Sequence, residues 1–349
     1  MQWNTFVDVF QKITAIISIF LNCILTYLIL KKSPKQLGSY KFLMIYISWF
    51  EIIYSIIDII TTPIFFSHDF IFVAMVYTKD SLFSHQILLI LNGIYCSCFG
   101  ASMGMFGLHF IYRYFVSYGS QFLKTFEDAR ILMWMMIPVI YGCIWGFTCY
   151  FIISPTEEIN NKLAEKLLAN FSWELQDIAY LGLHFFDLQA DGTYKVYWYS
   201  MVAVLAGIII IVSSLVAMFY CGVRCYLRLN KLMKMGTDTS QNTKNISKRS
   251  RKLQAQLFYA LVTQTAIPIF LMHIPFSIVI LFSFLGKDLG IFSGIASITI
   301  ALFPALDPLP TMLIIQSYRA TILSFLTCSK KVRAQVTYLT SASTIEVKT

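Results

Sequence analysis

Charged residues are scarce in this chain of 349 residues. Asp, Glu, Lys and Arg make up 13% of the sequence, whereas soluble globular proteins carry about 25%. Hydrophobic residues make up 57%, and the mean hydropathy is +0.68. Too few charges remain to cover a surface that faces water, which excludes a soluble enzyme. The aromatic content of 16% also excludes a disordered chain. These values indicate a helical protein that crosses a membrane several times.

Acidic residues are nearly missing from the long apolar runs. A transmembrane helix needs about 20 mostly apolar residues, and the chain has seven runs that can serve. They contain only three acidic residues, Glu51, Asp58 and Asp307. The runs are continuous and do not alternate, so they predict helices and not the strands of a β-barrel. The seven expected spans cover residues 13–30, 42–66, 86–112, 131–153, 198–226, 257–284 and 291–315.

Lys and Arg are almost absent from one side of this expected bundle. Of the 27 Lys and Arg residues, 21 lie on the side formed by alternate connections and the C-terminal tail. Such an excess marks the cytoplasmic side of a membrane protein. We therefore expect an extracellular N-terminus at residues 1–12 and a cytoplasmic tail at 316–349. The positive charge then reflects topology and attraction to anionic membrane lipids, with no nucleic acid as a partner.

Cysteine is missing from every expected outer loop. Seven of the eight cysteines fall within expected spans, where cysteine behaves as a small hydrophobic residue. We therefore expect no disulfide. The eighth, Cys328, follows a stretch at 317–326 that predicts a short amphipathic helix on the inner membrane surface. Its basic neighbours make Cys328 a candidate palmitoylation site, and a free thiol is the alternative.

The outer loop at 154–197 is too long for a plain connection. Its first four residues resemble a capping box, with the proline as the first helical residue, which predicts a short helix that ends near Asn170. Asn170 also begins a glycosylation acceptor sequence. Further along, Asp191 and Gly192 separate two short segments that we expect to form a hairpin. Helix and hairpin are expected to cover the mouth of the bundle as a lid.

Beneath this lid we expect a pocket for a small apolar or weakly polar ligand, rich in Phe, Tyr and Met. Asp58 is either a pocket residue or a structural partner for other polar groups of the outer half. The prolines of the sixth and seventh spans are expected to kink those helices and allow a switch between two states. Depth in the membrane alone suggests the pocket residues Asp58, Asn92, Tyr95, Tyr199, Phe270 and His273.

Three polar residues are expected at one depth near the middle of the bilayer. Asn22, Glu51 and Asp307 each lie roughly 14–15 Å from the inner boundary at 1.5 Å per residue. We hypothesise one hydrogen-bonded cluster of the first, second and seventh helices, in which two carboxyl groups hold a proton or a cation. The alternative is a protonated Glu51 bonded only to the backbone. The five histidines are too scattered to form a metal site within the bundle.

Six segments, in order along the chain, together resemble the nematode serpentine chemoreceptors of the Str class. The resemblance covers nearly the whole chain and implies an all-α membrane protein, a seven-transmembrane helix bundle of the G-protein-coupled receptor type. It also implies a location in the plasma membrane of sensory cilia, and neither enzymatic activity nor a cofactor. The segments are GSYKFLM at 38–44, HFIYRYF at 109–115, MFYCG at 218–222, LQAQLF at 253–258, QTAIP at 264–268 and PALDPL at 304–309.

The resemblance also implies a small chemical ligand outside, such as an odorant, and a heterotrimeric G protein inside. Arg113 falls where rhodopsin-like receptors carry the arginine that meets the G protein, and Asp307-Pro308 resembles their switch in the seventh helix. Tyr112 replaces the usual acidic neighbour of that arginine, so the ordinary ionic lock cannot form. The alternative function is a seven-helix ligand-gated cation channel. Such a channel has its N-terminus inside, which the distribution of Lys and Arg opposes.

Overall fold

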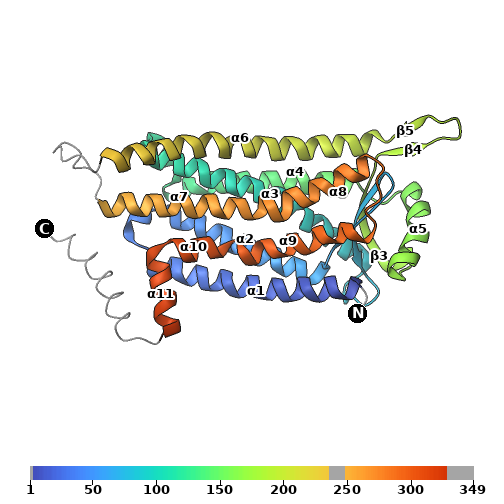
Figure 1. The fold of residues 1–349 in the computed structure, drawn as a ribbon, viewed down its shortest axis with the longest axis horizontal. Helices are drawn as coiled ribbons and strands as arrows, with labels where there is room; N and C mark the ends of the chain where they lie inside the picture. The colour runs from blue at the N-terminus through green and yellow to red at the C-terminus, as the bar shows by residue number, and fades with distance from the viewer. Residues whose placement is uncertain (1–2, 236–247, 328–349) are drawn as a thin grey trace.

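The computed structural model describes residues 3–235 and 248–327, which form an elongated bundle of long helices (Figure 1). Seven helical segments are long and apolar enough to cross a membrane. The expected seven-helix bundle is therefore confirmed. Its helices are α1 (Trp3–Lys32), α2 (Tyr40–Thr61), α3 (His85–Tyr118), α4 (Ile131–Phe147) with the π-helix η4 (Thr148–Ile152), α6 (Trp198–Met235), α7 (Lys248–Pro268) with the π-helix η6 (Ile269–His273) and α8 (Ile274–Phe284), and α9 (Gly294–Leu306) with α10 (Pro308–Ile314).

The two ends of the bundle differ. Strands and a short helix lie at the end where α1 begins, which we call the sheet end (Figure 1). The helix α11 (Gln316–Thr327) lies at the opposite end, the α11 end, and turns across the bundle axis. The short helix expected after the seventh span is present as α11, in which Tyr318 and Thr321 are buried while Phe325 is exposed. Cys328 lies outside the described residues.

The sides of the bundle present large apolar side chains. Ile16, Phe20, Met133 and Phe219 are each more than 60% exposed. A surface of this kind is unstable in water, because it leaves apolar area in contact with solvent. It matches the tails of lipids, so the packing agrees with a bundle that lies in a bilayer.

Helix α1 begins at Trp3 and not near residue 13. Val7 and Gln11 are fully buried, and they lie on the same inward face of the helix as the buried Ala15. The Gln11 side chain donates a hydrogen bond of 2.9 Å to the backbone oxygen of Pro63. The expected start of the first span at residue 13 is therefore too late, because residues 3–12 form the first turns of α1.

Helix α2 ends at Thr61, although a span reaching residue 66 was expected. Thr62 adopts a left-handed conformation with φ 35°, and Pro63 follows it. A proline disfavours helical geometry at the residue before it, so the helix stops here. The apolar residues that follow belong to a β-strand, and the sequence-based boundary was wrong at this point.

The strands β1 (Ile64–His68), β2 (Ile71–Tyr77) and β3 (Ile178–His184) form an antiparallel sheet in that order. Successive side chains of a strand point to opposite faces. Phe72 and Leu183 accordingly join the core of the bundle. Val73 and Tyr180 instead pack under the helix α5 (Glu157–Phe171). Both faces are thus covered, which explains why the strands read as continuous apolar runs.

The helix and the hairpin expected in the long outer loop are both present. Thr156, two residues after the expected cap, accepts a hydrogen bond from the backbone nitrogen of Ile159 and begins α5. The hairpin of β4 (Phe186–Leu188) and β5 (Tyr194–Val196) projects beyond the beginning of α6 (Figure 1). The three-stranded sheet and α5 cover this end of the bundle, and Phe186 of the hairpin packs against Phe70 and Phe284.

Helices α3 and α4 pack very closely because glycine removes side chains between them. A Cβ atom added at Gly104 would lie 2.9 Å from the Cα of Pro138 in α4. One added at Gly100 would lie 2.7 Å from the Cβ of Trp145. This close approach fixes the position of Trp145, which lines the cavity described below.

Candidate functional site

A cavity lies between the sheet and the helices, in the sheet-end half of the bundle. Its volume is about 30 Å³. A water molecule needs about 10–15 Å³ by this measure, so the cavity accepts a larger molecule only when side chains move. Most of the wall is aromatic or aliphatic. It is formed by Tyr54, Phe65, Phe72, Ala74, Tyr95, Cys96, Phe99, Trp145, Cys149, Ile153, Leu181, Leu183, Phe276 and Ile300.

Four of the six residues suggested for the pocket lie in or near this wall. Tyr95 lines the cavity, and its ring meets that of Tyr54 edge to face with centroids 5.1 Å apart. Asp58 is buried one helical turn beyond Tyr54. His273 lies behind the wall, with its ring centroid 4.7 Å from that of Phe99. Asn92 donates a hydrogen bond of 2.9 Å to the backbone oxygen of Ala74, so it joins α3 to the sheet.

The other two suggested residues lie elsewhere. Phe270 is 66% exposed on the side of the bundle, so its assignment to the pocket was wrong. Depth does not determine which face of a helix a residue occupies, and the π-helix η6 changes the helical register there. Phe276 lines the cavity in its place. Tyr199 is partly buried and is not among the residues of the wall.

The polar residues expected at one depth do meet in the middle of the bundle. Glu51 is buried close to both Asp307 and Asn22, and its Oε1 atom has no hydrogen-bond partner among the described residues. Asn22 donates a hydrogen bond of 3.1 Å to the backbone oxygen of Pro304. Sequence reasoning missed Gln264, whose side chain donates to Asp307 Oδ2 at 2.8 Å. The cluster therefore connects α1, α2 and the break between α9 and α10 with α7 as well.

Arg113 lies near the α11 end of α3 and is almost completely buried. Its guanidinium group stacks over the ring of Tyr40 at 3.5 Å, and its Nη1 donates 2.9 Å to Gln254 Oε1. Tyr112 stacks on Tyr40 with ring centroids 5.1 Å apart, and it meets Phe126 edge to face with centroids 5.0 Å apart. Arg113 thus contacts α2 and α7 without an acidic partner among the described residues.

A second cavity, of about 220 Å³, opens beside Arg113. Parts of α3, α6 and α7 form its wall, and Gln254 and Arg251 contribute polar groups. The Nε and Nη2 atoms of Arg113 are buried and have no hydrogen-bond partner within the described part of the chain. The region therefore offers unpaired donors to a group that enters from the α11 end.

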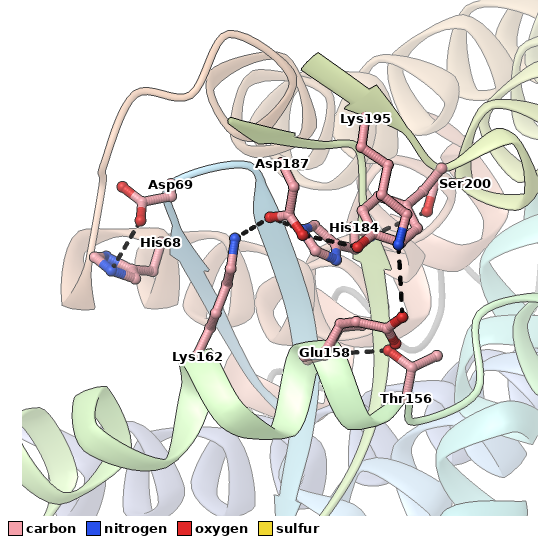
Figure 2. Close-up of polar contacts among 11 residues, drawn as sticks. His68, Asp69, Thr156, Glu158, Lys162, His184, Asp187, Lys195 and Ser200 are labelled. Carbon is pink, nitrogen blue, oxygen red and sulfur yellow. Dashed lines mark hydrogen bonds and ion pairs between the residues drawn. The ribbon is translucent and has the colours of Figure 1, made fainter. Parts of the chain in front are cut away.

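A polar network connects the sheet with α5 and the start of α6 (Figure 2). Asp187 accepts hydrogen bonds from Lys162 of α5, from Tyr197 at 2.7 Å and from His184 Nε2 at 3.0 Å. Burial lowers the pKa of His184, and Lys162 lowers it further, against the opposing effect of Asp187. Burial works against ionisation of Asp187, but the hydrogen bonds from Lys162 and Tyr197 keep its pKa below the ordinary value.

A second group of polar contacts joins two loops at the sheet end. His68 Nδ1 lies 2.7 Å from Asp288 Oδ2, and its Nε2 lies 3.3 Å from Asp69 Oδ2. Ser67 also forms an antiparallel bridge with Gly290. These contacts join the β1–β2 hairpin to the connection between α8 and α9. The described cysteines are all unpaired. Within the described residues, strand pairing and polar contacts therefore hold the loops of the sheet end together without a disulfide.

Asn170 lies on the exposed side of α5, one residue before its end. Its side-chain amide donates 2.9 Å to the backbone oxygen of Lys166. The acceptor asparagine is thus accessible at the sheet end. Residues 3–235 and 248–327 contain no group of three or more potential metal ligands.

The arrangement of the helices is that of a G-protein-coupled receptor. The structure of squid rhodopsin covers 93% of this chain with a TM-score of 0.60, and the chain covers 88% of it. The two sequences are 12% identical, so this likeness concerns the fold alone. The bundle therefore defines the chain as a multi-pass membrane protein with the receptor fold.

Residues 7–323 match the family described as serpentine type 7TM GPCR chemoreceptor Str. The chain belongs to this family. It is 36% identical to the G-protein coupled receptor str-217 of Caenorhabditis elegans, over 90% of this chain and 88% of that protein. It is 30% identical to the serpentine receptor class r-10 of the same species, over 94% and 93%. The expected resemblance is confirmed, and family membership favours a receptor over the cation channel.

Proposed function

We propose that this chain is an olfactory receptor that binds a small chemical ligand in the cavity beneath the sheet and activates a heterotrimeric G protein at the α11 end. The family supports the class of receptor. The excess of Lys and Arg in the connections of the α11 end supports a cytoplasmic position for that end. The protein is then oriented with the sheet outside, in the plasma membrane of a sensory cilium.

The observation that carries the proposal is the environment of Arg113. Its side chain is buried beside a cavity that opens at the proposed cytoplasmic end, and two of its nitrogen atoms lack partners there. A G protein can supply carbonyl or carboxylate oxygens to such donors. Because Gln254 of α7 bonds the remaining Nη1 atom, a movement of α7 that breaks this bond would free the whole guanidinium group for the G protein.

The central cluster lies between the two cavities and is the proposed switch. Gln264 of α7 bonds both the Asp307 carboxyl group and its backbone oxygen, beside the helix break before Pro308. A movement of α7 at Arg113 therefore strains the contacts of Asp307. A ligand shifts such an equilibrium only by the difference between its affinities for the two states. Asn22 and Glu51 stabilise the state seen here.

Two modifications belong to this proposal. Asn170 is a glycosylation site on the extracellular side, where its exposed position on α5 is favourable. Cys328, which follows α11 in the sequence, is a palmitoylation site.

The proposal is tested by Arg113→Ala in the full chain. We expect normal surface expression and loss of ligand-dependent G-protein activation. Arg130→Ala is the matched control, because Arg130 is exposed and makes only a distant contact with Asp128 at 3.9 Å. Normal signalling by the Arg113 variant would refute the proposed role. Antibody staining of a C-terminal tag only after permeabilisation supports the orientation, and staining of intact cells contradicts it.

A further inference from the structure

A groove lies on the side of the bundle at the α11 end, between the end of α1 and the beginnings of α2 and α4. We call it the α11-end groove. Its volume is about 950 Å³, within the range of pockets that hold small molecules. Leu37, Phe126 and Ile131 form a buried floor. The connection at residues 33–39 forms one edge of the groove, and residues 126–129 form the other.

One part of the groove is apolar and opens to the side of the bundle. Leu30 of α1, Phe42 of α2 and Leu132 of α4 line it, and they are 63%, 48% and 61% exposed. In a bilayer such side chains lie against hydrocarbon. The polar edges follow the ends of the same helices, at the depth where lipid heads lie. A molecule that fills the whole groove therefore has apolar chains joined to a polar head, as a phospholipid has.

The two edges of the groove carry opposite charges. Lys35 lies on one edge and Lys41 in the first turn of α2 beside it, whereas Glu127 and Asp128 lie on the other edge. All four side chains are exposed. Among the described residues neither lysine has a carboxylate partner, and Asp128 makes only a distant contact of 3.9 Å with Arg130. The groove thus offers a cationic edge and an anionic edge that do not neutralise each other directly.

The beginning of α2 strengthens the cationic edge. The first backbone N–H groups of a helix have no partner within the helix, and they favour anions such as phosphate. Ser39 precedes this turn and lines the groove, and its side chain makes no capping hydrogen bond. The N–H groups of the first turn and the ammonium group of Lys41 are therefore both available to a phosphate group on this edge.

We propose that the α11-end groove binds a phospholipid whose zwitterionic head carries a primary ammonium group. The phosphate group lies beside Lys35, Lys41 and the first turn of α2, and the ammonium group donates hydrogen bonds to Glu127 and Asp128. Such a head matches both edges, whereas a purely anionic head leaves the acidic edge without a partner. An anionic phospholipid is therefore the competing ligand class.

The test uses the purified full-length receptor in detergent, titrated with phosphatidylethanolamine, phosphatidylcholine or phosphatidylglycerol of identical acyl chains. Native mass spectrometry counts the bound lipids and gives an apparent Kd for each. Phosphatidylcholine keeps both charges, but its methylated ammonium group donates no N–H hydrogen bond. Phosphatidylglycerol keeps only the negative charge. We expect phosphatidylethanolamine to bind about threefold or more tightly than either of the others, since exposed charge pairs contribute modestly.

Two double variants test the two edges separately. In Glu127→Gln with Asp128→Asn, the preference for phosphatidylethanolamine over phosphatidylcholine should vanish, and phosphatidylglycerol should bind at least as tightly as phosphatidylethanolamine. In Lys35→Ala with Lys41→Ala, all three lipids should bind more weakly, because all three carry a phosphate group. The four side chains are exposed, so Tm without added lipid should stay near the wild-type value. Loss of binding is then distinct from loss of the fold.

Each edge has a matched control variant. Lys124 is exposed in the same connection as Glu127, but it does not line the groove. Glu165 is exposed on α5 at the sheet end, on the opposite side of the membrane. Lys124→Ala and Glu165→Gln should each leave the three Kd values unchanged.

The inference is wrong if phosphatidylethanolamine and phosphatidylcholine bind equally to the wild type. It is also wrong if the preference survives in the acidic double variant, or if the lysine double variant binds all three lipids as the wild type does. Tighter binding of phosphatidylglycerol that is lost in the lysine double variant assigns the groove to an anionic lipid instead. Neither the chemical ligand nor the G protein takes part in this measurement, so its outcome is independent of the proposed receptor function.

Discussion

The guanidinium group of Arg113 lies 3.5 Å from the centre of the Tyr40 ring and donates 2.9 Å to Gln254 Oε1. The contact joins α3 to α7 through a neutral acceptor and to α2 through an aromatic face. Both interactions are weaker than a buried ion pair with good geometry. In the proposed function, a modest difference in ligand affinity between two states is enough to overcome such contacts.

Gln254→Ala should raise signalling in the absence of ligand. The change removes the only hydrogen bond that Arg113 makes to α7 among the described contacts. A hydrogen bond to a charged group contributes about 1.5–3 kcal/mol, and about 1.4 kcal/mol corresponds to a factor of ten. Basal G-protein activation should rise by about tenfold or more when receptor numbers at the cell surface are matched. It is measured as nucleotide exchange in membranes.

The neighbouring glutamine is the control for this variant. Gln256 has the same side chain on the same helix, but it only accepts a long contact of 3.5 Å from the backbone nitrogen of Gln316. Gln256→Ala should leave basal activation near the wild-type level. Equal activation by both variants would show that Gln254 does not restrain Arg113.

Asn22 and Asp307 should be energetically coupled. Both belong to the buried cluster around Glu51. Residues in one hydrogen-bonded network show coupling energies of about 0.5–3 kcal/mol in a double-mutant cycle. The change in the free energy of unfolding caused by Asn22→Ala and Asp307→Asn together should therefore differ from the sum of the changes caused by each alone. A control cycle pairs Asn22→Ala with Asn92→Ala, whose partner is the backbone of Ala74. Additivity in both cycles would contradict the cluster.

Much of the fold follows from the sequence because a bilayer imposes length and polarity on every span. The seven helices, α5 and α11 were expected from apolar runs, capping residues and charge. The sheet was not expected. Ile64, Phe65 and Phe66 were taken as the end of the second span, although Pro63 disfavours a helix there. A strand that is covered on both faces lacks the alternation that would have revealed it.

The residues of the candidate site could be predicted only where the depth of a residue in the membrane determines which other residues it contacts. Glu51 and Asp307 meet because polar groups at one depth seek each other in a low-dielectric interior. Phe270 was wrongly assigned to the pocket because its depth in the membrane does not determine which face of the helix it occupies. Trp145 and Leu181 line the cavity through the close packing of α3 against α4 and the pairing of β3 with β2. Neither long-range contact leaves a local signal in the chain.

The sheet end should loosen as the pH falls from 7 to 5. Burial lowers the pKa of His184 below the ordinary value of about 6.5. The unfolded sheet end then binds a proton in this range that the folded one does not, so stability is full above pH 6.5 and is lost below it. Asp187, with its lowered pKa, contributes only nearer pH 4. Hydrogen exchange of β3, corrected for intrinsic rates, should become faster at pH 5.

His184→Gln should remove most of this pH dependence, because glutamine does not titrate and keeps a donor for Asp187. His85→Gln is the control, since His85 is exposed. If exchange of β3 responds to pH equally in wild type and in the His184 variant, another group is responsible.

Gly104→Ala should destabilise the bundle, while Gly107→Ala should not. A Cβ atom at position 104 lies 2.9 Å from the backbone Cα of Pro138, and backbone cannot rotate away. Overpacking of this kind costs about 1–3 kcal/mol. At Gly107 the nearest atom is Ser214 Oγ at 3.8 Å, an ordinary contact. Thermal unfolding in detergent should thus show a lower Tm only for the first variant. Equal Tm values would mean that α4 can move away from α3, and that the position of Trp145 in the cavity wall does not depend on this contact.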